Sequence, residues 1–334
     1  MDTLQDAVDE LATRTRFSGV VRVDLAGETE VCSAYGFADR ALEIPNTIET
    51  RFGTASFAKT LTALVVLALV DRGTLKLDTT ARSLLGTDLP LVADDVTVEH
   101  LLAHRSGIGD YFDEGTFGEK TDYLLQVPVH TLETAEDYLK VLDGYPTVFS
   151  AGEQFAYNNG GFVVLAILAE RAAGASYHDL VRTVITEPAG MVDTAFLRSD
   201  ELPARAAKGY LAVDGLRTNV LHLPVVGVGD GGVYTTAADV SAFWDALFAG
   251  RIVASASVAE LVRPRSDWPE ESERYGFGIH LHATNDAVWL EGADAGVSAN
   301  SLHQPSTSTT FTVISNWTDG AWPFVALLDE RLGI

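Results

Sequence analysis

The chain has 334 residues, of which 47% are hydrophobic and 21% are charged, and its formal net charge is -24. This length exceeds a usual single hydrophobic core and predicts two lobes. The excess of acidic residues repels phosphate backbones and anionic lipid heads, which argues against nucleic acid or a membrane as a partner. A single cysteine, Cys32, excludes an internal disulfide framework and a thiolate metal cluster.

The N-terminal segment, MDTLQDAVDELATRT, predicts an amphipathic helix. It carries acidic residues where a secretion signal carries lysine or arginine, and it lacks an apolar central region. The longest apolar run, residues 61–70, has about half the length that a membrane span needs. We therefore expect a cytoplasmic protein without a membrane segment.

The elements expected along the chain change from strands to helices and back to strands. Residues 17–40 alternate apolar and polar side chains around a glycine-containing turn, which predicts an antiparallel hairpin. Helical periodicity follows in residues 56–72, 97–103, 134–142, 159–173, 177–187 and 236–249. Strand patterns return in residues 274–283, 287–293, 297–304 and 309–317, and a last helix is predicted near residues 322–332.

Strands at both ends with helices between them predict an α/β (α+β) fold with two parts. The first part is an antiparallel sheet flanked by helices and formed from both chain ends, residues 1–55 and 264–334. The second is a mainly helical lobe, residues 56–263, inserted into the first. We expect the active site in the cleft between them.

The stretch GTASFAKTLTALVVLALVDRG, residues 53–73, carries the first chemical motif. Ser56 and Lys59 form a Ser-x-x-Lys, and one helical turn between them places the hydroxyl and the amine on the same face. A lysine against an apolar helix is disfavoured in its charged form, so Lys59 is suited to accept a proton from Ser56. A short strand followed by small residues before Ser56 points its amide into the cleft as an oxyanion donor.

The second motif is Tyr157-Asn158-Asn159, immediately before another apolar helix. A tyrosine hydroxyl beside Lys59 can relay a proton to a leaving group, and an asparagine side chain can hold both a lysine and a substrate carbonyl. The alternative interpretation is a turn with an asparagine helix cap and a half-buried aromatic ring.

With these motifs the chain resembles the penicillin-recognising serine hydrolases, in the branch of class C β-lactamases, D-Ala-D-Ala peptidases and family VIII esterases. The resemblance runs over nearly the whole chain and includes VTVEHLLAHRSGIGDYF, FAYNNGGFVVLAILAERAAG, GDGGVYTTAADVSAFWDAL and EGADAGVSAN. It implies the β-lactamase/transpeptidase-like fold. It also implies that Ser56 is the acylated nucleophile, Lys59 its base partner and Tyr157 the proton relay, with Asn159 orienting lysine and substrate.

The family's third element is Lys-Thr-Gly or His-x-Gly on a strand that lines the cleft. Its best counterpart here is Leu290-Glu291-Gly292. Gly292 allows close approach of a substrate, and the Ala293 amide would complete the oxyanion hole. Leu290 replaces the cation that binds substrate carboxylates, which disfavours β-lactamase and carboxypeptidase activity and favours ester hydrolysis.

Other residues near these motifs have two interpretations. Glu291 and Asp294 are either acids exposed to solvent, or they bind the amine of an amine-bearing substrate. Tyr111, Phe112 and Tyr234 either line a pocket for the acyl or alcohol group or are ordinary packing.

Two apparent motifs are set aside. The glycines at 227, 229 and 232 fit a dinucleotide fingerprint but lack its βαβ context, and we expect a tight loop leading into a helix capped near Thr236. His104 suggests a Ser-His-Asp triad, but it lies at a helix end, and we expect a structural role. The eight histidines are scattered, so no metal is expected.

The sequence thus predicts a serine hydrolase that needs no cofactor and acts on a small-molecule ester, amide or peptide. The alternatives are a β-lactamase or D-Ala-D-Ala carboxypeptidase, and a non-catalytic binding module that keeps the fold.

Overall fold

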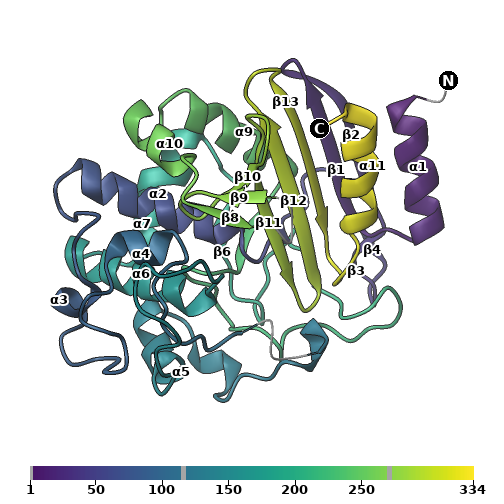
Figure 1. Ribbon diagram of the computed structural model, residues 1–334. Helices are drawn as coiled ribbons and strands as arrows, with labels where there is room; N and C mark the ends of the chain where they lie inside the picture. Colours follow the sequence, from purple (N-terminus) through teal and green to yellow (C-terminus); the bar gives the residue numbers. More distant parts are fainter. Residues whose placement is uncertain (1–2, 114–117, 269–272) are drawn as a thin grey trace.

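The computed structural model describes residues 3–113, 118–268 and 273–334. Its largest element is an eight-stranded antiparallel sheet (Figure 1). Its strands lie in the order β2-β1-β13-β12-β11-β10-β9-β8. Their bounds are β1 Gly19–Leu25, β2 Glu28–Tyr35, β8 Ser266–Trp268, β9 Glu273–Tyr275, β10 His280–His282, β11 Val288–Asp294, β12 Val297–Gln304 and β13 Thr309–Ser315. β1 pairs with β13 in a register that places Val21 opposite Val313. The predicted sheet from both chain ends is confirmed.

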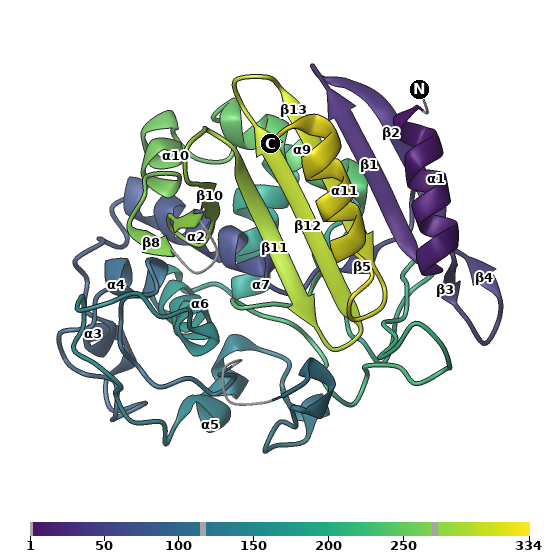
Figure 2. The same cartoon turned by 45° about the vertical axis from the view of Figure 1, so that its right-hand side comes forward.

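Helices cover both faces of this sheet. α1 (Leu4–Thr15) and α11 (Trp322–Leu332) lie over the outer face (Figure 2). There Val8 and Phe324 pack with Val21 and Phe311 of the sheet. α9 (Ala237–Phe248) contacts β1 and β13 on the opposite face. Because successive side chains of a strand point to opposite faces, Val21 and Val23 of β1 face the outer helices, whereas Asp24 faces α9 and accepts a hydrogen bond from the Ser241 hydroxyl.

Two apolar helices, α2 (Phe57–Asp71) and α6 (Asn159–Ala173), pack against each other at the centre of the helical part. Both are hydrophobic on nearly every side, as is typical of fully buried helices, and residues 57–69 of α2 are all buried. The shorter helices are α3 (Ala81–Leu85), α4 (Val98–Leu102), α5 (Leu139–Leu142), α7 (Tyr177–Val181), α8 (Glu187–Ala189) and α10 (Ser255–Leu261). In the described part of the chain, no helix is both long and apolar enough to cross a membrane.

A small sheet holds the start of α2 in place. Its strands are β5 (Phe52–Gly53), β7 (Val233–Thr235) and β6 (Ala195–Phe196), with β7 in the centre. The backbone N–H and the hydroxyl of Thr54 both donate to the carbonyl of Val233, at 2.9 and 3.0 Å. A further two-stranded sheet joins β3 (Phe37–Asp39) and β4 (Ile44–Pro45). The loop before α2 is therefore hydrogen-bonded to the start of β7, which directly follows the glycine-rich segment 227–232.

That glycine-rich segment packs against protein rather than opening a dinucleotide site. A Cβ at Gly229 would lie 2.1 Å from the carbonyl oxygen of Phe162 in α6, and Gly232 has a positive φ of 87°. Both positions therefore require glycine. The helix that follows is capped by the Thr236 hydroxyl, as the sequence predicts.

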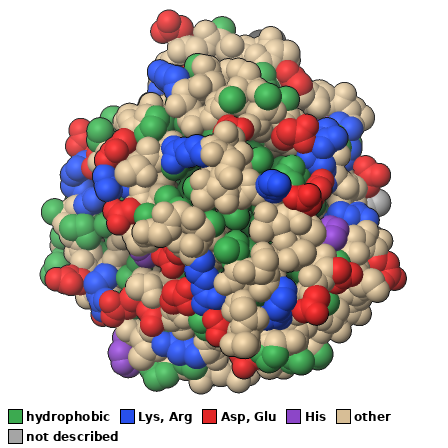
Figure 3. All heavy atoms as spheres, turned by 90° about the vertical axis from the view of Figure 1, so that its left-hand side faces the viewer, with side chains coloured by type: hydrophobic (Ala, Val, Ile, Leu, Met, Phe, Trp, Pro, Cys, Tyr) green, Lys and Arg blue, Asp and Glu red, His purple; other side chains and the backbone are tan. Residues whose placement is uncertain are grey.

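The surface does not concentrate the negative charge in one place on the face shown in Figure 3. Acidic and basic side chains are interspersed there, with hydrophobic side chains between them. Basic side chains therefore lie beside many of the acidic ones on this face, although the whole chain has a net charge of -24.

Candidate active site

Ser56 lies at the N-terminal end of α2, in a tight backbone turn. The preceding Ala55 has a φ of 44°, an uncommon conformation for a residue with a Cβ, and its carbonyl accepts a hydrogen bond from the N–H of Gly232. Serine at a helix N-cap usually bonds its hydroxyl to the backbone of the first turn. The Ser56 hydroxyl makes no such capping bond and instead contacts Lys59.

Lys59 is buried, with 1% of its surface exposed. Its Nζ lies 2.9 Å from Ser56 Oγ, 2.7 Å from Asn159 Oδ1 and 2.8 Å from the carbonyl oxygen of Asp230. The Asn159 and Asp230 oxygens can only accept hydrogen bonds, whereas the Ser56 hydroxyl can also donate. Of these three contacts, the one with Ser56 allows a proton to pass to the amine.

Tyr157 lies against Lys59 and is held by His104. The Lys59 Nζ is 4.9 Å from the centre of the Tyr157 ring, and the His104 ring is 4.4 Å from it. The His104 carbonyl accepts from the N–H of Ala156 at 2.9 Å, and its Nδ1 accepts from the N–H of Asn158 at 3.0 Å. Burial, together with the charge of Lys59, lowers the pKa of His104 well below its usual value, which keeps the ring neutral. His104 is thus structural, but its partner is the backbone on both sides of Tyr157.

Asn158 and Asn159 divide two tasks. Asn158 caps α6 with its side-chain oxygen, which accepts from the N–H of Gly161 at 2.6 Å. Asn159 bonds Lys59 through Oδ1 and donates through Nδ2 to the Phe112 carbonyl at 2.8 Å. Its backbone N–H donates to Asp110, whose pKa burial raises to about 6. The helix cap of the alternative interpretation is therefore present at Asn158, while Asn159 contacts Lys59.

Strand β11 passes directly beside the Ser56 turn. A Cβ added to Gly292 would lie 2.1 Å from the carbonyl oxygen of Thr54 and 3.0 Å from the backbone nitrogen of Ser56. Only glycine allows this approach. Ala293, the next residue, lines both pockets that open at Ser56.

Leu290 is not brought to these pockets. It is 4% exposed and packs in the core beside Phe57, Leu61 and Phe243. Residues 290 and 292 share one face of β11, so the close packing that admits Gly292 also buries Leu290 against α2. The polar side chain of this motif that does line a pocket is Glu291, whose pKa is raised by burial.

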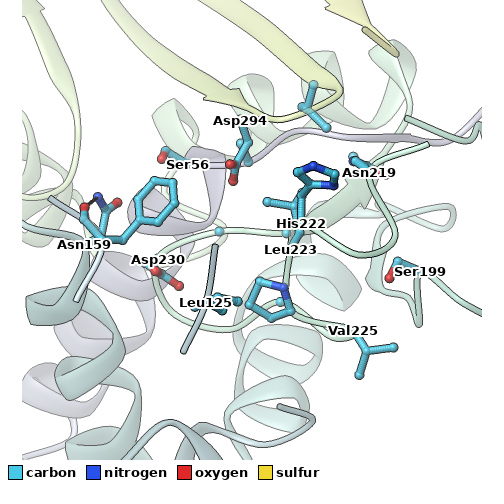
Figure 4. Close-up of a pocket in the computed structure, with 18 of the residues that line it drawn as sticks. Ser56, Leu125, Asn159, Ser199, Asn219, His222, Leu223, Val225, Asp230 and Asp294 are labelled. Atoms are coloured by element: carbon cyan, nitrogen blue, oxygen red, sulfur yellow. Dashed lines mark hydrogen bonds between the residues drawn. The ribbon is translucent and has the colours of Figure 1, made fainter. Parts of the chain in front are cut away.

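Two pockets meet at Ser56. The inner pocket is lined by Ser56 and Asn159 together with the aromatic residues Tyr111, Phe112, Tyr123, Tyr138 and Tyr234 and, farther along, Leu223, Val225 and Ser199 (Figure 4). The outer pocket is lined by Ser56, Tyr157, Trp268, His280, Glu291 and Lys120, among others. Tyr111, Phe112 and Tyr234 thus line a pocket, which agrees with the first of the two interpretations given for them.

Asp230 is the residue of the site that the sequence did not indicate. Its carbonyl accepts from Lys59, and its side chain accepts from the Tyr111 hydroxyl at 2.6 Å. Burial raises the pKa of this carboxyl, against the opposing effect of Lys59. Asp230 stands between the glycines of the segment that resembles a dinucleotide motif. An acidic residue among closely packed glycines was the feature of the sequence that could have indicated its role.

Comparison with known proteins agrees with this geometry. The profile of the Beta-lactamase family matches residues 4–332. The chain belongs to this family. Penicillin-binding protein 4* of Bacillus subtilis is 29% identical over 82% of the chain and 62% of its own length, and esterase EstB of Burkholderia gladioli is 34% identical over 61% of the chain and 53% of its own length.

Among solved structures, a penicillin-binding protein from Bacillus halodurans superposes with a TM-score of 0.90 at 31% identity and covers 97% of this chain and 99% of that one. The D-amino acid amidase of Ochrobactrum anthropi SV3, solved with L-phenylalanine amide, gives a TM-score of 0.76 at 26% identity and covers 94% of this chain and 90% of that one. This family member spans about half to three fifths of the length of the first curated relatives that it matches.

Proposed function

We propose that the chain is a serine hydrolase that forms an acyl-enzyme on Ser56 and acts first of all on esters. The observation that carries the proposal is the buried Lys59 amine, 2.9 Å from a Ser56 hydroxyl that opens into two pockets. A serine beside a base is the general arrangement of an activated nucleophile.

In the proposed reaction, Ser56 Oγ attacks the substrate carbonyl carbon as its proton passes to Lys59. The bond to the leaving group then breaks, and the proton reaches the leaving oxygen through Tyr157. Water attacks the acyl-enzyme in the second half, releases the acid and returns a proton to Ser56. The amides of Ser56 and Ala293 would hold the oxyanion in both halves, and one such donor is worth about 3 kcal/mol.

The side chains around Ser56 support an ester rather than a carboxylate-bearing β-lactam or peptide. Leu290, the predicted counterpart of the family's cation, lies in the core and lines neither pocket, so the support for an ester comes from the acidic residues. Glu291 lines the outer pocket, and Asp230 and Asp294 line the inner one. Carboxylates at these positions repel a substrate carboxylate.

A second candidate, hydrolysis of amides or peptides that carry an amine, is favoured by Glu291. Its side chain lines the outer pocket beside Trp268 and Tyr157, where an acid and aromatic faces would stabilise an ammonium group. Esterase EstB, a D-aminopeptidase of Brucella anthropi and the D-amino acid amidase are relatives whose names cover both candidates.

Active-site labelling tests the proposal. We expect a fluorophosphonate probe to modify Ser56, and Ser56→Ala to lose both the label and the turnover of p-nitrophenyl butyrate. Ser83→Ala is the matched control, because Ser83 is an exposed serine that lines neither pocket and should remain without effect. Labelling elsewhere would refute the assignment of Ser56 as the nucleophile. No turnover of any ester, amide or nitrocefin would refute the enzyme and favour a binding module.

A further inference from the structure

Two residues that line the inner pocket each have a buried polar atom that has no hydrogen-bond partner among the described residues. These atoms are Ser199 Oγ and His222 Nδ1. Figure 4 places them on the side of the pocket away from Asn159. A buried donor or acceptor without a partner destabilises the folded chain, so two of them beside one pocket point to a polar group that binds there.

The backbone fixes both residues in place. The N–H of Ser199 donates to the carbonyl of Val225 at 2.9 Å, and the N–H of His222 donates to the carbonyl of Asn219 at 2.8 Å. Burial, and secondarily the charge of Arg217, lowers the pKa of His222. The imidazole is therefore neutral at pH 7 and can donate or accept one hydrogen bond at each nitrogen.

The walls between Ser56 and these two atoms are mainly apolar. They include Tyr111, Tyr138, Tyr234, Leu125, Leu223 and Val225. A chain or ring that crosses this region is stabilised by burying its apolar surface. The pocket thus suits an apolar segment that ends in a polar group.

The charge of the pocket selects the kind of polar group. Asp230 and Asp294 line it, whereas no lysine or arginine is among the described residues that line it. A carboxylate end would be repelled by these acids. The hydroxyl of Ser199 and the neutral imidazole of His222 instead match an uncharged group that both donates and accepts.

The position of Tyr157 indicates which part of the substrate enters the inner pocket. Tyr157 lines the outer pocket and not the inner one. In the proposed reaction it protonates the leaving group, so the leaving group lies in the outer pocket. The acyl group is then directed to the inner pocket.

We propose that the inner pocket binds the acyl group and that Ser199 and His222 select acyl chains ending in an uncharged hydrogen-bonding group, such as a carboxamide. This inference rests on the proposed function for the orientation of the substrate. It names the acid that the enzyme releases as an apolar chain with a neutral polar end.

The test compares p-nitrophenyl esters of six to ten carbons whose acyl chains end in a carboxamide, a methyl group or a carboxylate. At the best chain length we expect the carboxamide ester to have about tenfold higher kcat/KM than the methyl ester, the value of one good hydrogen bond, and the carboxylate ester to be the poorest. The carboxamide-to-methyl ratio should fall toward one in Ser199→Ala and in His222→Leu. It should remain about tenfold in Ser83→Ala.

A binding measurement separates this inference from the proposed function. Calorimetry with Ser56→Ala and the N-butyl amides of the same acids needs no turnover, and the carboxamide compound should bind about tenfold more tightly than its methyl analogue. Equal binding and equal kcat/KM at every length would overturn the inference and assign the two polar atoms to water. Tight carboxamide binding without ester turnover would support the pocket and refute the hydrolase.

Discussion

Replacing Gly292 by alanine tests how closely β11 must approach the nucleophile. The added Cβ would lie 2.1 Å from the Thr54 carbonyl oxygen, and real Cβ contacts stay above 3.0 Å, so the strand and the Ser56 turn must separate by about 0.9 Å. Overpacking of this kind costs about 1–3 kcal/mol. A misplacement near 1 Å can cost about 10²-fold in rate, and loss of one oxyanion donor about 10²–10³-fold.

We therefore expect Gly292→Ala to lower kcat for p-nitrophenyl butyrate by about 10²–10³-fold and the melting temperature by several degrees. Steady-state kinetics and thermal unfolding measure the two effects. Gly53→Ala is the matched control for stability, because its Cβ would meet only Tyr234 and Val297, both at 3.6 Å or more, and its melting temperature should stay within about 2 °C. A Gly292→Ala protein with parental kcat would show that this approach does not shape the site.

Three further changes probe the core, the proton relay and the pH dependence. Leu290→Lys buries an ammonium group at a cost of several kcal/mol, so it should lower the melting temperature without improving carboxylate-bearing esters; a stable variant with improved kcat/KM for them would place residue 290 in the cleft. His104→Ala should lower kcat about tenfold in the parent but far less in Tyr157→Phe, because His104 acts by positioning Tyr157, and equal losses in both backgrounds would contradict that role. Burial raises the pKa of Asp329 in the folded chain from 3.8 to about 6, so the stability that its protonated form contributes is complete below pH 4 and lost as the pH rises through 6. Asp329→Asn should accordingly unfold at higher temperature than the parent at pH 8 and at the same temperature at pH 4, and no difference at pH 8 would refute this assignment.

Long periodic segments were predictable from the sequence. The six central helical stretches have counterparts in the structure, and the pattern at residues 159–173 matches α6 at both ends. Most strand predictions also hold, but residues 274–283, predicted as one strand, form the two short antiparallel strands β9 and β10. A short strand before Ser56 was predicted and is β5, whereas the two-residue strand β6 was not predicted, because two residues carry no periodicity. The pairing of both strands with β7 joins segments far apart in the sequence.

The chemistry of the site divides in the same way. Ser56 and Lys59 lie one helical turn apart, so their contact is local and the sequence motif is sufficient to predict it. The third contact of Lys59, with the carbonyl of Asp230, joins residues 171 positions apart through a backbone atom that any residue type could supply. No residue pattern signals such a contact.

The sequence alone therefore determined the local pairing of nucleophile and amine, the apolar helices that carry it and the sheet built from both ends, because each depends on neighbours within a turn or on alternation along a strand. Only the tertiary structure decided that Leu290 faces the core, that His104 holds the backbone around Tyr157 and that Ser199 and His222 line the pocket of Ser56. These facts depend on which distant surfaces meet. That is set by the packing of the whole molecule rather than by any one segment.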